Sequence, residues 1–352
     1  MAGEARCRCR PRWTLPIGGV IISVTPPGRD PVSQSEGISR ISIFRTTIET
    51  IKGSAALLTI TVNTIVLTTV LCLLAIPKWL APTDAIRDRI RQVLAGIAEA
   101  WISVNNLILS LYRQPIWDID IPADLDREGC YLVSCNHRSW VDILVLQRCF
   151  NRKLPLLRFF LKRELIRVPF LGLAWWALDF PFMRRDSKRK LARRPGLKGR
   201  DLENARKACE KFRTIPVAMM NFPEGTRFSV GKRDREKSPF RNLLLPRIGG
   251  MGQVMYALSE QLDGLIDVTI VYPQADPSAP APTFWDLLTG RIPQVVALAR
   301  RRDIPANLLG RDFRADPHFR RELEAWMMGM WEEKDRLISQ LQASYPASAK
   351  SA

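Results

Sequence analysis

The stretch YLVSCNHRSWVDILVLQRCF, residues 131–150, contains a strand, a turn and a helix in direct succession. YLVSC is a short apolar run typical of a buried strand, and WVDILVLQRCF carries apolar residues at helical spacing. Ser139 has the side chain of a helix N-cap. Asn136 and His137 therefore fall where a strand ends and a helix begins, and α/β proteins place their ligand sites at such strand ends.

The chain after Pro115 continues this alternation of short apolar runs and amphipathic stretches. Strands are predicted at 116–121, 131–135, 177–183, 215–222, 266–272 and 293–299. Helices are predicted near 140–150, 201–213 and 250–262, and from Pro317 to about Leu341, the last with Asp316 as N-cap. The pattern predicts an α/β fold with a mixed sheet flanked by helices.

The composition limits the function classes. With 352 residues, 46% hydrophobic and 25% charged, the chain is long enough to bury a core and is not a disordered protein. Its formal net charge of +18 favours anionic partners, either phospholipid headgroups or nucleic acid. Seven cysteines without a CxxC pair argue against a disulfide framework, and two histidines argue against a structural zinc site.

One segment is apolar enough to cross a membrane. Between Gly53 and Pro77 the sequence has no charged residue. At ~1.5 Å per residue, a helix of roughly 23 residues spans the ~30 Å hydrocarbon core. We therefore predict a transmembrane helix at 51–78, with a buried core helix as the alternative. Basic residues flank the segment on both sides, so charge bias does not set its orientation.

The other predicted segments surround this helix. We expect 1–50 to be a disordered N-terminal tail, although a poor signal peptide or sequence upstream of the true start remain alternatives. Residues 84–113 form an amphipathic helix that either lies on the bilayer or packs on the domain. The α/β domain is expected to occupy 114–345.

Two polar residues of the opening stretch suggest a catalytic pair. His137 and Asp142 are five positions apart, so on one regular helix they would point about 140° from each other. They meet only if His137 lies in the turn before the helix. Asp142 can then hold the imidazole in one tautomer and leave the other nitrogen to take a proton. The alternative is structural, since Ser139 and Asp142 also fit the spacing of a capping box.

A second stretch, NFPEGTRFS at 221–229, also follows a predicted strand. Gly225 lets backbone amides approach a ligand, and Arg227 can form paired hydrogen bonds with a phosphate. Alone, this is an ordinary turn. Together with NHRSWVD it forms the motif set of the glycerolipid acyltransferases, and from about Asp118 to Tyr272 the chain resembles the lysophosphatidic acid acyltransferase family.

The resemblance rests on matched motifs. Asn136, His137 and Asp142 match the family's first block, and Phe222 to Arg227 match its Phe-Pro-Glu-Gly-Thr-Arg block without change. ALDFPFMRRDS fits an intervening block only loosely. NLLLPRIGGM, LIDVTIVYP and FLKRELIRVPFLG are similar to a branch shared by some bacterial inner-membrane enzymes and by eukaryotic lysocardiolipin and acylglycerophosphate acyltransferases.

The resemblance implies transfer of a fatty acyl group from acyl-CoA or acyl carrier protein to the sn-2 hydroxyl of lysophosphatidic acid, giving phosphatidic acid. It makes His137 the general base and Asp142 the group that orients it. It assigns substrate binding to the loop residues Glu224, Gly225, Thr226, Arg227, Arg184 and Arg185. The thioester is a co-substrate, and neither a metal nor another cofactor is implied.

Other functions remain open. A remodelling enzyme would use the same residues on lysocardiolipin, lysophosphatidylglycerol or lysophosphatidylinositol. A membrane adaptor or nucleic-acid binder on a degenerate acyltransferase fold is the non-enzymatic alternative, and the intact motifs argue against it. Cys135 is either an acyl-enzyme nucleophile or a buried small side chain. The basic stretch 183–200 fits anionic lipid, the phosphates of the coenzyme or a solvated loop.

The resemblance also implies a location and partners. Acyl thioesters are intracellular, so we expect a single-pass protein of a bacterial inner membrane with residues 78–352 in the cytoplasm. The expected partners are the lysophospholipid, the thioester and the membrane. No specific nucleic-acid partner is expected, and the sequence does not indicate an oligomeric state.

Overall fold

The computed structural model describes residues 14–17, 20–23, 31–112, 115–183, 212, 215–273 and 280–345, with side chains from residue 44 onward. The chain divides into two units, residues 1–51 and 52–352. The first unit holds the antiparallel pair β1 (Thr14–Ile17) and β2 (Val20–Ser23) and the start of helix α1 (Pro31–Leu80). The helix thus begins well before residue 51, inside the segment expected to be a tail.

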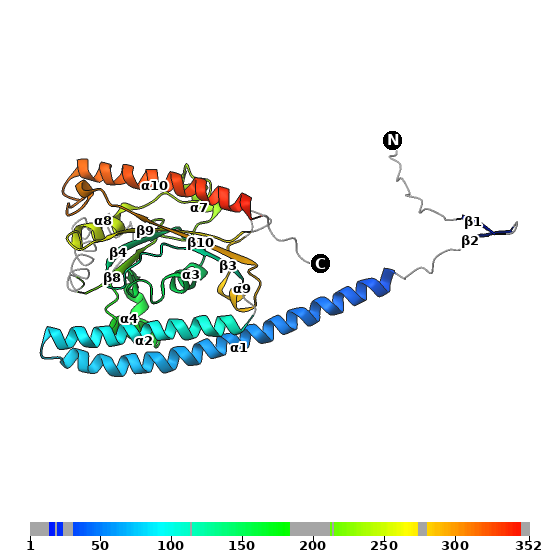
Figure 1. Cartoon of the computed structure of the whole chain (residues 1–352), viewed down its shortest axis with the longest axis horizontal. Coiled ribbons are helices and arrows are strands. Elements are labelled where there is room, and N and C mark those ends of the chain that lie inside the picture. The colour runs from blue at the N-terminus through cyan, green and yellow to red at the C-terminus, as the bar shows by residue number, and fades with distance from the viewer. Residues whose placement is uncertain are drawn as a thin grey trace. The chain divides into compact units, whose positions relative to one another are not determined.

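A six-stranded mixed sheet forms the centre of the second unit, in the order β3–β10–β9–β4–β8–β5 (Figure 1). Its strands are β3 (Ile116–Asp120), β4 (Cys130–Cys135), β5 (Leu157–Phe159), β8 (Val217–Asn221), β9 (Gly264–Val271) and β10 (Gln294–Arg302). Strands β9, β4, β8 and β5 are parallel neighbours, and β10 runs antiparallel to β9. The predicted mixed α/β sheet is confirmed.

The helices mostly follow the predicted alternation. They are α2 (Asp84–Leu111), α3 (Val141–Phe150), η1 (Arg163–Arg167), α4 (Leu171–Ala177), α7 (Val230–Glu236), α8 (Ile248–Ala257), α9 (Phe284–Leu288), η3 (Ala306–Leu308) and α10 (Pro317–Ser344). Helix α10 starts as predicted, with the Asp316 side chain accepting hydrogen bonds from the amides of His318 and Phe319. Almost all of the predicted helix 201–213 lies outside the described residues.

One predicted strand is wrong. Helix α4 reaches Ala177, and only Phe182–Met183 of the expected strand 177–183 forms a strand, β7, which pairs with β6 (Leu161–Lys162). Leu and Ala are strong helix formers, and Asp179 turns the chain with a positive φ of 59°. The segment therefore winds into a short helix before it turns toward β7.

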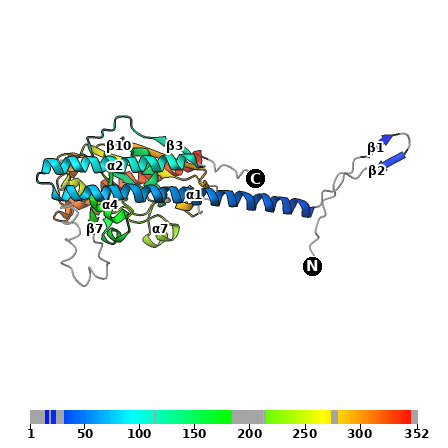
Figure 2. The ribbon, with the colours of Figure 1, turned by 90° about the horizontal axis from the view of Figure 1, so that it is seen from below.

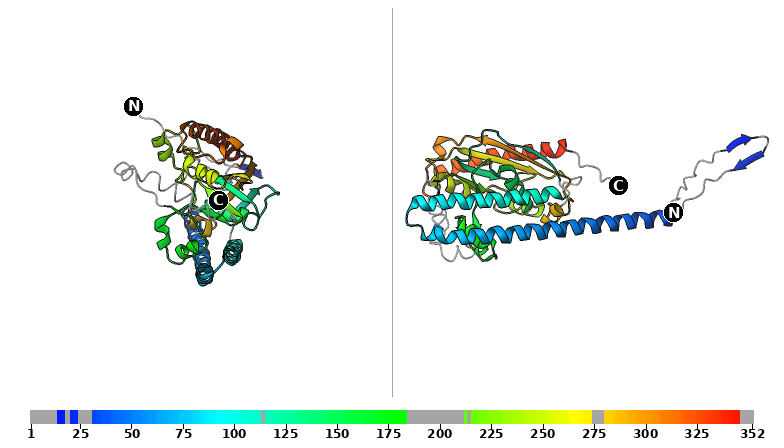
Figure 3. Two further views of the ribbon diagram at one scale, coloured as in Figure 1. Left: turned by 90° about the vertical axis from the view of Figure 1, so that its left-hand side faces the viewer. Right: turned by 60° about the horizontal axis from the view of Figure 1, so that its bottom comes forward.

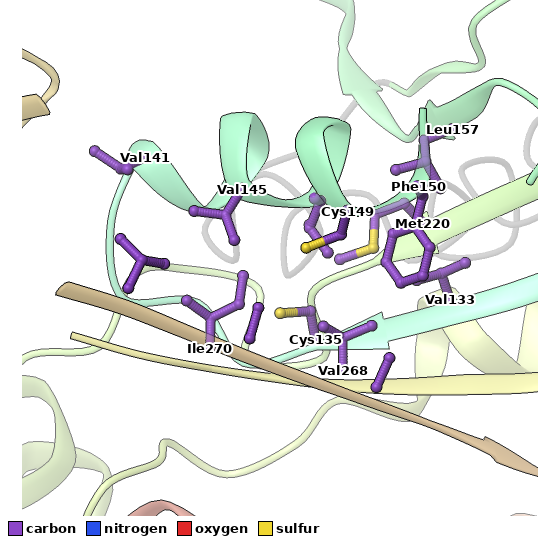
Figure 4. Packing of buried hydrophobic residues seen from close by; sticks show 14 of the residues in the cluster. Val133, Cys135, Val141, Val145, Cys149, Phe150, Leu157, Met220, Val268 and Ile270 are labelled. Atoms are coloured by element: carbon purple, nitrogen blue, oxygen red, sulfur yellow. The ribbon is translucent and has the colours of Figure 1, made fainter. Parts of the chain in front are cut away.

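The helices cover both faces of the sheet. In Figure 1, α8 and α10 lie on one face, and α3 and α9 lie on the other. Figure 4 shows the apolar side of α3 packed on the sheet, with Val145 and Phe150 facing Cys135 and Val268. This packing positions the segment between β4 and α3, which holds the first motif.

Residues 52–80 of α1 run beside α2, and the two helices form a hairpin along the domain (Figures 1 and 2). The Asn63 side chain donates to the Asn105 side chain at 2.8 Å, and the Trp101 indole donates to the Thr64 hydroxyl at 3.2 Å. At the end of α1, the Lys78 ammonium pairs with Asp179 at 2.5 Å. Polar contacts therefore join the two helices to each other and to the domain.

Helix α1 contains the apolar stretch 51–78 that the sequence predicts to be a transmembrane helix. Within the described part of the chain, two helices, Phe44–Leu80 and Asp84–Leu111, are long and apolar enough to span a membrane by length and composition. However, Gly53 lies against Thr289, where a Cβ on the glycine would be 2.7 Å away, and Lys78 is held by Asp179. Both ends of the apolar stretch therefore contact residues of the same domain.

A buried ion pair ties α10 to the sheet. The Lys334 ammonium is fully buried and lies 2.6 Å from the Asp267 carboxylate on β9, and it also donates to the Val268 carbonyl at 2.6 Å. Arg302 reaches the same carboxylate at 3.0 Å. Removing one partner of a buried pair leaves a buried charge without compensation.

We therefore predict that Lys334→Ala destabilises the fold by about 3–5 kcal/mol. The free energy of unfolding, measured by denaturant titration in detergent, should fall by this amount. Arg336→Ala, an exposed position two residues further along α10, is the matched control and should change it little. Equal effects of the two variants would contradict a special role for the buried pair.

Candidate active site

The Asn136–His137 segment leaves the carboxyl end of β4 and enters α3. The Asn136 side chain donates to the Ile270 carbonyl at 2.9 Å and accepts from the Ile270 amide at 2.9 Å. This pair of bonds ties the segment to β9, the neighbouring parallel strand. His137 is therefore held at the carboxyl edge of the sheet, as the strand–turn–helix pattern predicted.

His137 and Asp142 meet across the turn. The His137 Nδ1 atom lies 2.9 Å from the Asp142 carboxylate, which is fully buried. The same carboxylate accepts the backbone amides of Arg138 and Ser139 at 2.7 and 2.8 Å. An acceptor-only carboxylate selects the tautomer with hydrogen on Nδ1 and leaves Nε2 as the nitrogen that can take a proton.

The catalytic and capping interpretations thus involve one carboxylate. Asp142 accepts from the Ser139 amide, which is one half of a capping box, while the Ser139 hydroxyl accepts from Val141 and not from Asp142. The helix itself is assigned from Val141, so the expected Ser139 N-cap is displaced by one residue. The same hydrogen bonds of Asp142 therefore hold the turn and orient His137.

The second motif lies directly against the first. The imidazole of His137 stacks on the Phe222 ring, with centroids 4.0 Å apart and planes 17° apart. The Phe228 amide donates to the His137 carbonyl at 2.7 Å. The side chain of His137 keeps 13% exposure, so the stacked ring remains open to a small ligand. The two motifs that the sequence separates widely form one site.

Glu224 occupies a different position from the one expected. Its carboxylate is fully buried and accepts the amides of His137 at 2.7 Å and Leu244 at 2.9 Å. Burial raises the pKa of Glu224 to about 8, although the two amide donors act in the opposite direction. In this structure both oxygens of Glu224 are engaged by backbone amides, and Glu224 braces the His137 turn.

The remaining residues of the turn lie at the rim. Gly225 adopts a φ of +67°, a left-handed conformation that favours glycine. The Thr226 hydroxyl accepts from Lys232 at 2.9 Å. Arg227 is exposed, with its guanidinium carbon 5.0 Å from the centroid of the Trp140 ring. Arg227, stacked beside the site, is thus available to an anionic ligand.

Arg184 and Arg185, the two arginines expected from the loosely matching block, lie outside the described residues, as does nearly all of the basic stretch 183–200.

Sequence reasoning missed one residue of the site. The Tyr272 hydroxyl donates to the Asp142 carboxylate at 2.6 Å, and the ring is buried. Burial, followed by the charge of Asp142, raises the pKa of Tyr272 well above its ordinary value, so it stays a donor. The only sequence signal was its place at the end of the predicted strand 266–272.

Cys135 does not have the environment of a nucleophile. Its side chain is fully buried, and burial raises the pKa of the thiol well above its ordinary value. A reactive cysteine needs an accessible thiolate. Over the described ranges, no group of three or more His, Cys, Asp or Glu side chains is placed to hold a metal ion.

An apolar cavity of about 60 Å³ lies between the hairpin, α3 and α4. Its wall includes Leu71, Ile102, Phe150, Leu157, Trp175 and Phe180. Phe159 links it to the site, since its ring centroid lies 6.5 Å from that of Phe180 and 6.4 Å from that of Phe222. Aromatic rings therefore connect the imidazole to the apolar cavity.

The Glu224→Gln variant tests whether Glu224 holds the His137 turn in place. The Gln carbonyl oxygen can accept one backbone N–H but the NH2 group cannot accept the other, so one of the two bonds is lost, and we expect a fall of ~1–3 kcal/mol in stability together with lower kcat. The parent also has a pH signature. The folded-state pKa of Glu224, about 8, exceeds its ordinary value of 4.5, so protonation of Glu224 stabilises the fold. This contribution to the free energy of unfolding is complete below pH 4.5 and is lost as the pH rises through 8.

Chemical denaturation of parent and variant at pH 5 and pH 8.5 measures this difference. The parent should lose more stability than Glu224→Gln between the two pH values. Glu236→Gln, a partly exposed carboxylate on α7, is the control and should follow the parent. An equal loss of stability between pH 5 and pH 8.5 in the parent and in Glu224→Gln would rule out the raised pKa of Glu224.

The Tyr272→Phe variant tests whether the Tyr272 hydroxyl supports the His137–Asp142 pair. It removes only the hydroxyl that donates to Asp142, and hydrogen bonds to charged groups contribute ~1.5–3 kcal/mol. If that support acts on the base, kcat should fall about tenfold or more while KM for the acceptor changes little. The thermal midpoint must be measured in parallel, because a fall in kcat that follows unfolding would not support a positioning role.

The comparisons with known proteins agree with this geometry. Residues 118–273 match the family model described as Acyltransferase. The chain is 28% identical to the probable 1-acyl-sn-glycerol-3-phosphate acyltransferase 5 of Arabidopsis thaliana, over 60% of this chain and 53% of that protein. It is 27% identical to the lysocardiolipin acyltransferase 1 of Danio rerio, over 74% of this chain and 64% of that protein.

Two further proteins are similar. The 2-acyl-1-lysophosphatidylinositol acyltransferase of Saccharomyces cerevisiae is 27% identical, over 58% of this chain and 59% of that protein. Among solved structures, the 1-acyl-sn-glycerophosphate acyltransferase PlsC of Thermotoga maritima is 16% identical with a TM-score of 0.46, over 82% of this chain and 97% of that chain. The chain thus spans about half to two thirds of the length of these curated relatives. Residues 118–273 thus match an acyltransferase domain, and the chain is similar to glycerolipid acyltransferases.

Proposed function

We propose that the protein transfers a fatty acyl group from a thioester to the free sn-2 hydroxyl of lysophosphatidic acid and so forms phosphatidic acid. The observation that carries the proposal is the His137–Asp142 pair, held at 2.9 Å and partly open to ligand, with the exposed Arg227 at the rim of the same site. The matched family model and the relatives' names support an O-acyl transfer.

In this mechanism His137 acts as general base. Its Nε2 takes the proton of the acceptor hydroxyl while the hydroxyl oxygen attacks the thioester carbonyl. The tetrahedral intermediate collapses, the C–S bond breaks, and the imidazolium returns the proton to the leaving sulfur. Asp142, buried and held by three further donors, stabilises the imidazolium and keeps the ring oriented. The cycle needs no protein nucleophile, consistent with the buried Cys135.

The rim supplies charges for an acidic acceptor. Arg227 can bind a phosphate through two hydrogen bonds, and Lys232, which holds Thr226 and the Arg227 carbonyl, supports the turn. We propose Gly225, Thr226 and Arg227, together with Arg184 or Arg185, as the groups that bind the acceptor phosphate. The acyl donor in this proposal is acyl-CoA or acyl carrier protein, with neither a metal nor a further cofactor.

A remodelling reaction is the second candidate. The relatives are named for a 1-acyl-sn-glycerol-3-phosphate, a lysophosphatidylinositol and a lysocardiolipin substrate. All three acceptors carry a phosphate and a free glycerol hydroxyl, and Arg227 would bind that phosphate in each. The choice of headgroup therefore depends on residues beyond the shared motifs.

The hairpin supports membrane association. Its outward residues are large and apolar, among them Leu58 and Leu73 on α1 and Leu107 on α2. We propose that these outward apolar residues of the hairpin attach the domain to the membrane. The intracellular thioester favours a cytoplasmic face, and a bacterial inner membrane remains part of the proposal.

The direct test is release of free thiol from oleoyl-CoA by the purified protein in detergent, with a panel of lysophospholipids. Lysophosphatidic acid should give the fastest release, and His137→Ala should lower the rate by ~10²–10⁴. His318→Ala, at the other histidine, is exposed on α10 and should keep the parent rate. Preference for another acceptor would indicate remodelling, and an active His137→Ala would exclude the mechanism.

A second prediction concerns Arg227. Loss of a charge-assisted bidentate contact costs ~1.5–3 kcal/mol, so Arg227→Ala should raise KM for lysophosphatidic acid at least tenfold and change kcat less. Arg227→Lys should restore only part of this loss in KM, since an ammonium is a point charge. Arg235→Ala, an exposed arginine on α7, serves as the control. An unchanged KM in Arg227→Ala would remove Arg227 from the proposed phosphate site.

A further inference from the structure

The segment from η1 to the end of α4 has an apolar outer face. Ile166, Phe170, Leu173 and Trp176 are each between 39% and 55% exposed. The opposite side of α4, with Gly172, Ala174 and Ala177, is buried. A surface helix normally turns polar residues outward, and α4 has no polar residue. We call the four exposed side chains the α4 patch.

We infer that the α4 patch is a second membrane-contact surface, which inserts into the headgroup region of an anionic bilayer beside the hairpin. The inference goes beyond acyl transfer, and its evidence is independent of the acceptor. It concerns which part of the domain touches lipid.

Packing holds the patch in a fixed shape. A Cβ on Gly172 would be 2.2 Å from the Ile166 carbonyl oxygen, so η1 and α4 approach more closely than any side chain at 172 permits. Phe170 turns the chain between them with a φ of 61°, which is uncommon for a residue other than glycine. The outer face is therefore a built surface that does not depend on a loose loop.

The patch continues the apolar surface of the hairpin. One cluster joins Leu71 of α1, Leu94 and Ile102 of α2, Ala174 of α4, and Leu178, which directly follows α4. In Figures 2 and 3, α4 lies beside α1 on the side of the domain that carries the hairpin. Because α4 packs on the hairpin, a bilayer that receives the outward residues of α1 also meets α4.

The charges around the patch select the kind of bilayer. Lys162, Arg163 and Arg167 are exposed next to it, against the single carboxylate of Glu164 in the same segment. Exposed cations at the edge of an apolar surface attract anionic headgroups, and tryptophan prefers the interfacial region. The patch thus combines an aromatic, apolar centre with a basic border.

This placement has a consequence for the site. The inner side of α4 supplies Ala174 and Trp175 to the wall of the apolar cavity, and rings from Phe180 through Phe159 lead from that wall to Phe222 and the imidazole. Helix α4 would therefore separate the lipid headgroups from the cavity by the thickness of one helix.

The test places a photo-crosslinking amino acid, p-benzoylphenylalanine, at one position of the full chain. The protein is reconstituted with vesicles of phosphatidylcholine and phosphatidylglycerol and irradiated without any substrate. Position 173 is the test position, 73 in the hairpin is the positive control, and 230 is the negative control. Val230 is similarly exposed but lies on α7, away from the hairpin in Figure 1.

We expect lipid adducts at 173 at a yield near that at 73 and several-fold above that at 230. A yield at 173 equal to that at 230 overturns the proposal, and so does a protein–protein adduct at 173, which would assign the patch to a second copy of the chain. A high yield at 73 with a low yield at 173 would show that the hairpin alone contacts lipid. None of these readings depends on acyltransferase activity, so failure here is separate from failure of the proposed function.

A pair of charge variants gives a second readout. Leu173→Glu should lower partitioning into phosphatidylglycerol-containing vesicles several-fold, while Val230→Glu should leave it unchanged. Both variants must retain the parent far-ultraviolet circular dichroism spectrum. Unchanged partitioning of a folded Leu173→Glu protein contradicts the inference.

Discussion

The buried carboxylate of Asp142 is the constraint on which the site depends. An ionised carboxylate inside a protein is costly unless donors surround it. Here the amides of Arg138 and Ser139, the hydroxyl of Tyr272 and the imidazole of His137 all reach it. Meeting that requirement forces the chain after β4 into a tight turn, and the turn sets the direction of the imidazole. Formation of this turn therefore also orients the imidazole of His137.

The topology explains how distant segments supply these donors. Strands β4, β8 and β9 are parallel neighbours, so their carboxyl ends lie at one edge of the sheet. His137 follows β4, Glu224 follows β8 and Tyr272 follows β9. Two buried carboxylates, Asp142 and Glu224, then hold the His137 backbone and ring from different sides. The antiparallel β10 lies beyond β9.

Local patterns predicted what depends on local chemistry. The strand, turn and helix of 131–150 follow from spacing, and the proximity of His137 and Asp142 follows from helix geometry once the turn is placed. Tyr272 and the burial of Glu224 could not be predicted in this way, because their partners come from other strands. The segment 177–183 was misassigned because a short apolar run has no period that separates helix from strand.

The apolar stretch 53–77 illustrates a different limit. Hydropathy measures whether a helix prefers lipid, but a helix that crosses a bilayer and one that lies along it have the same composition. Polar residues inside the stretch identify the side of the helix that faces protein. Asn63 bonds to Asn105 and Thr64 accepts from Trp101, so this side of α1 already faces α2, while Lys78 reaches the domain at Asp179. Most of the remaining α1 surface between these contacts is exposed and apolar, and this surface is left for lipid.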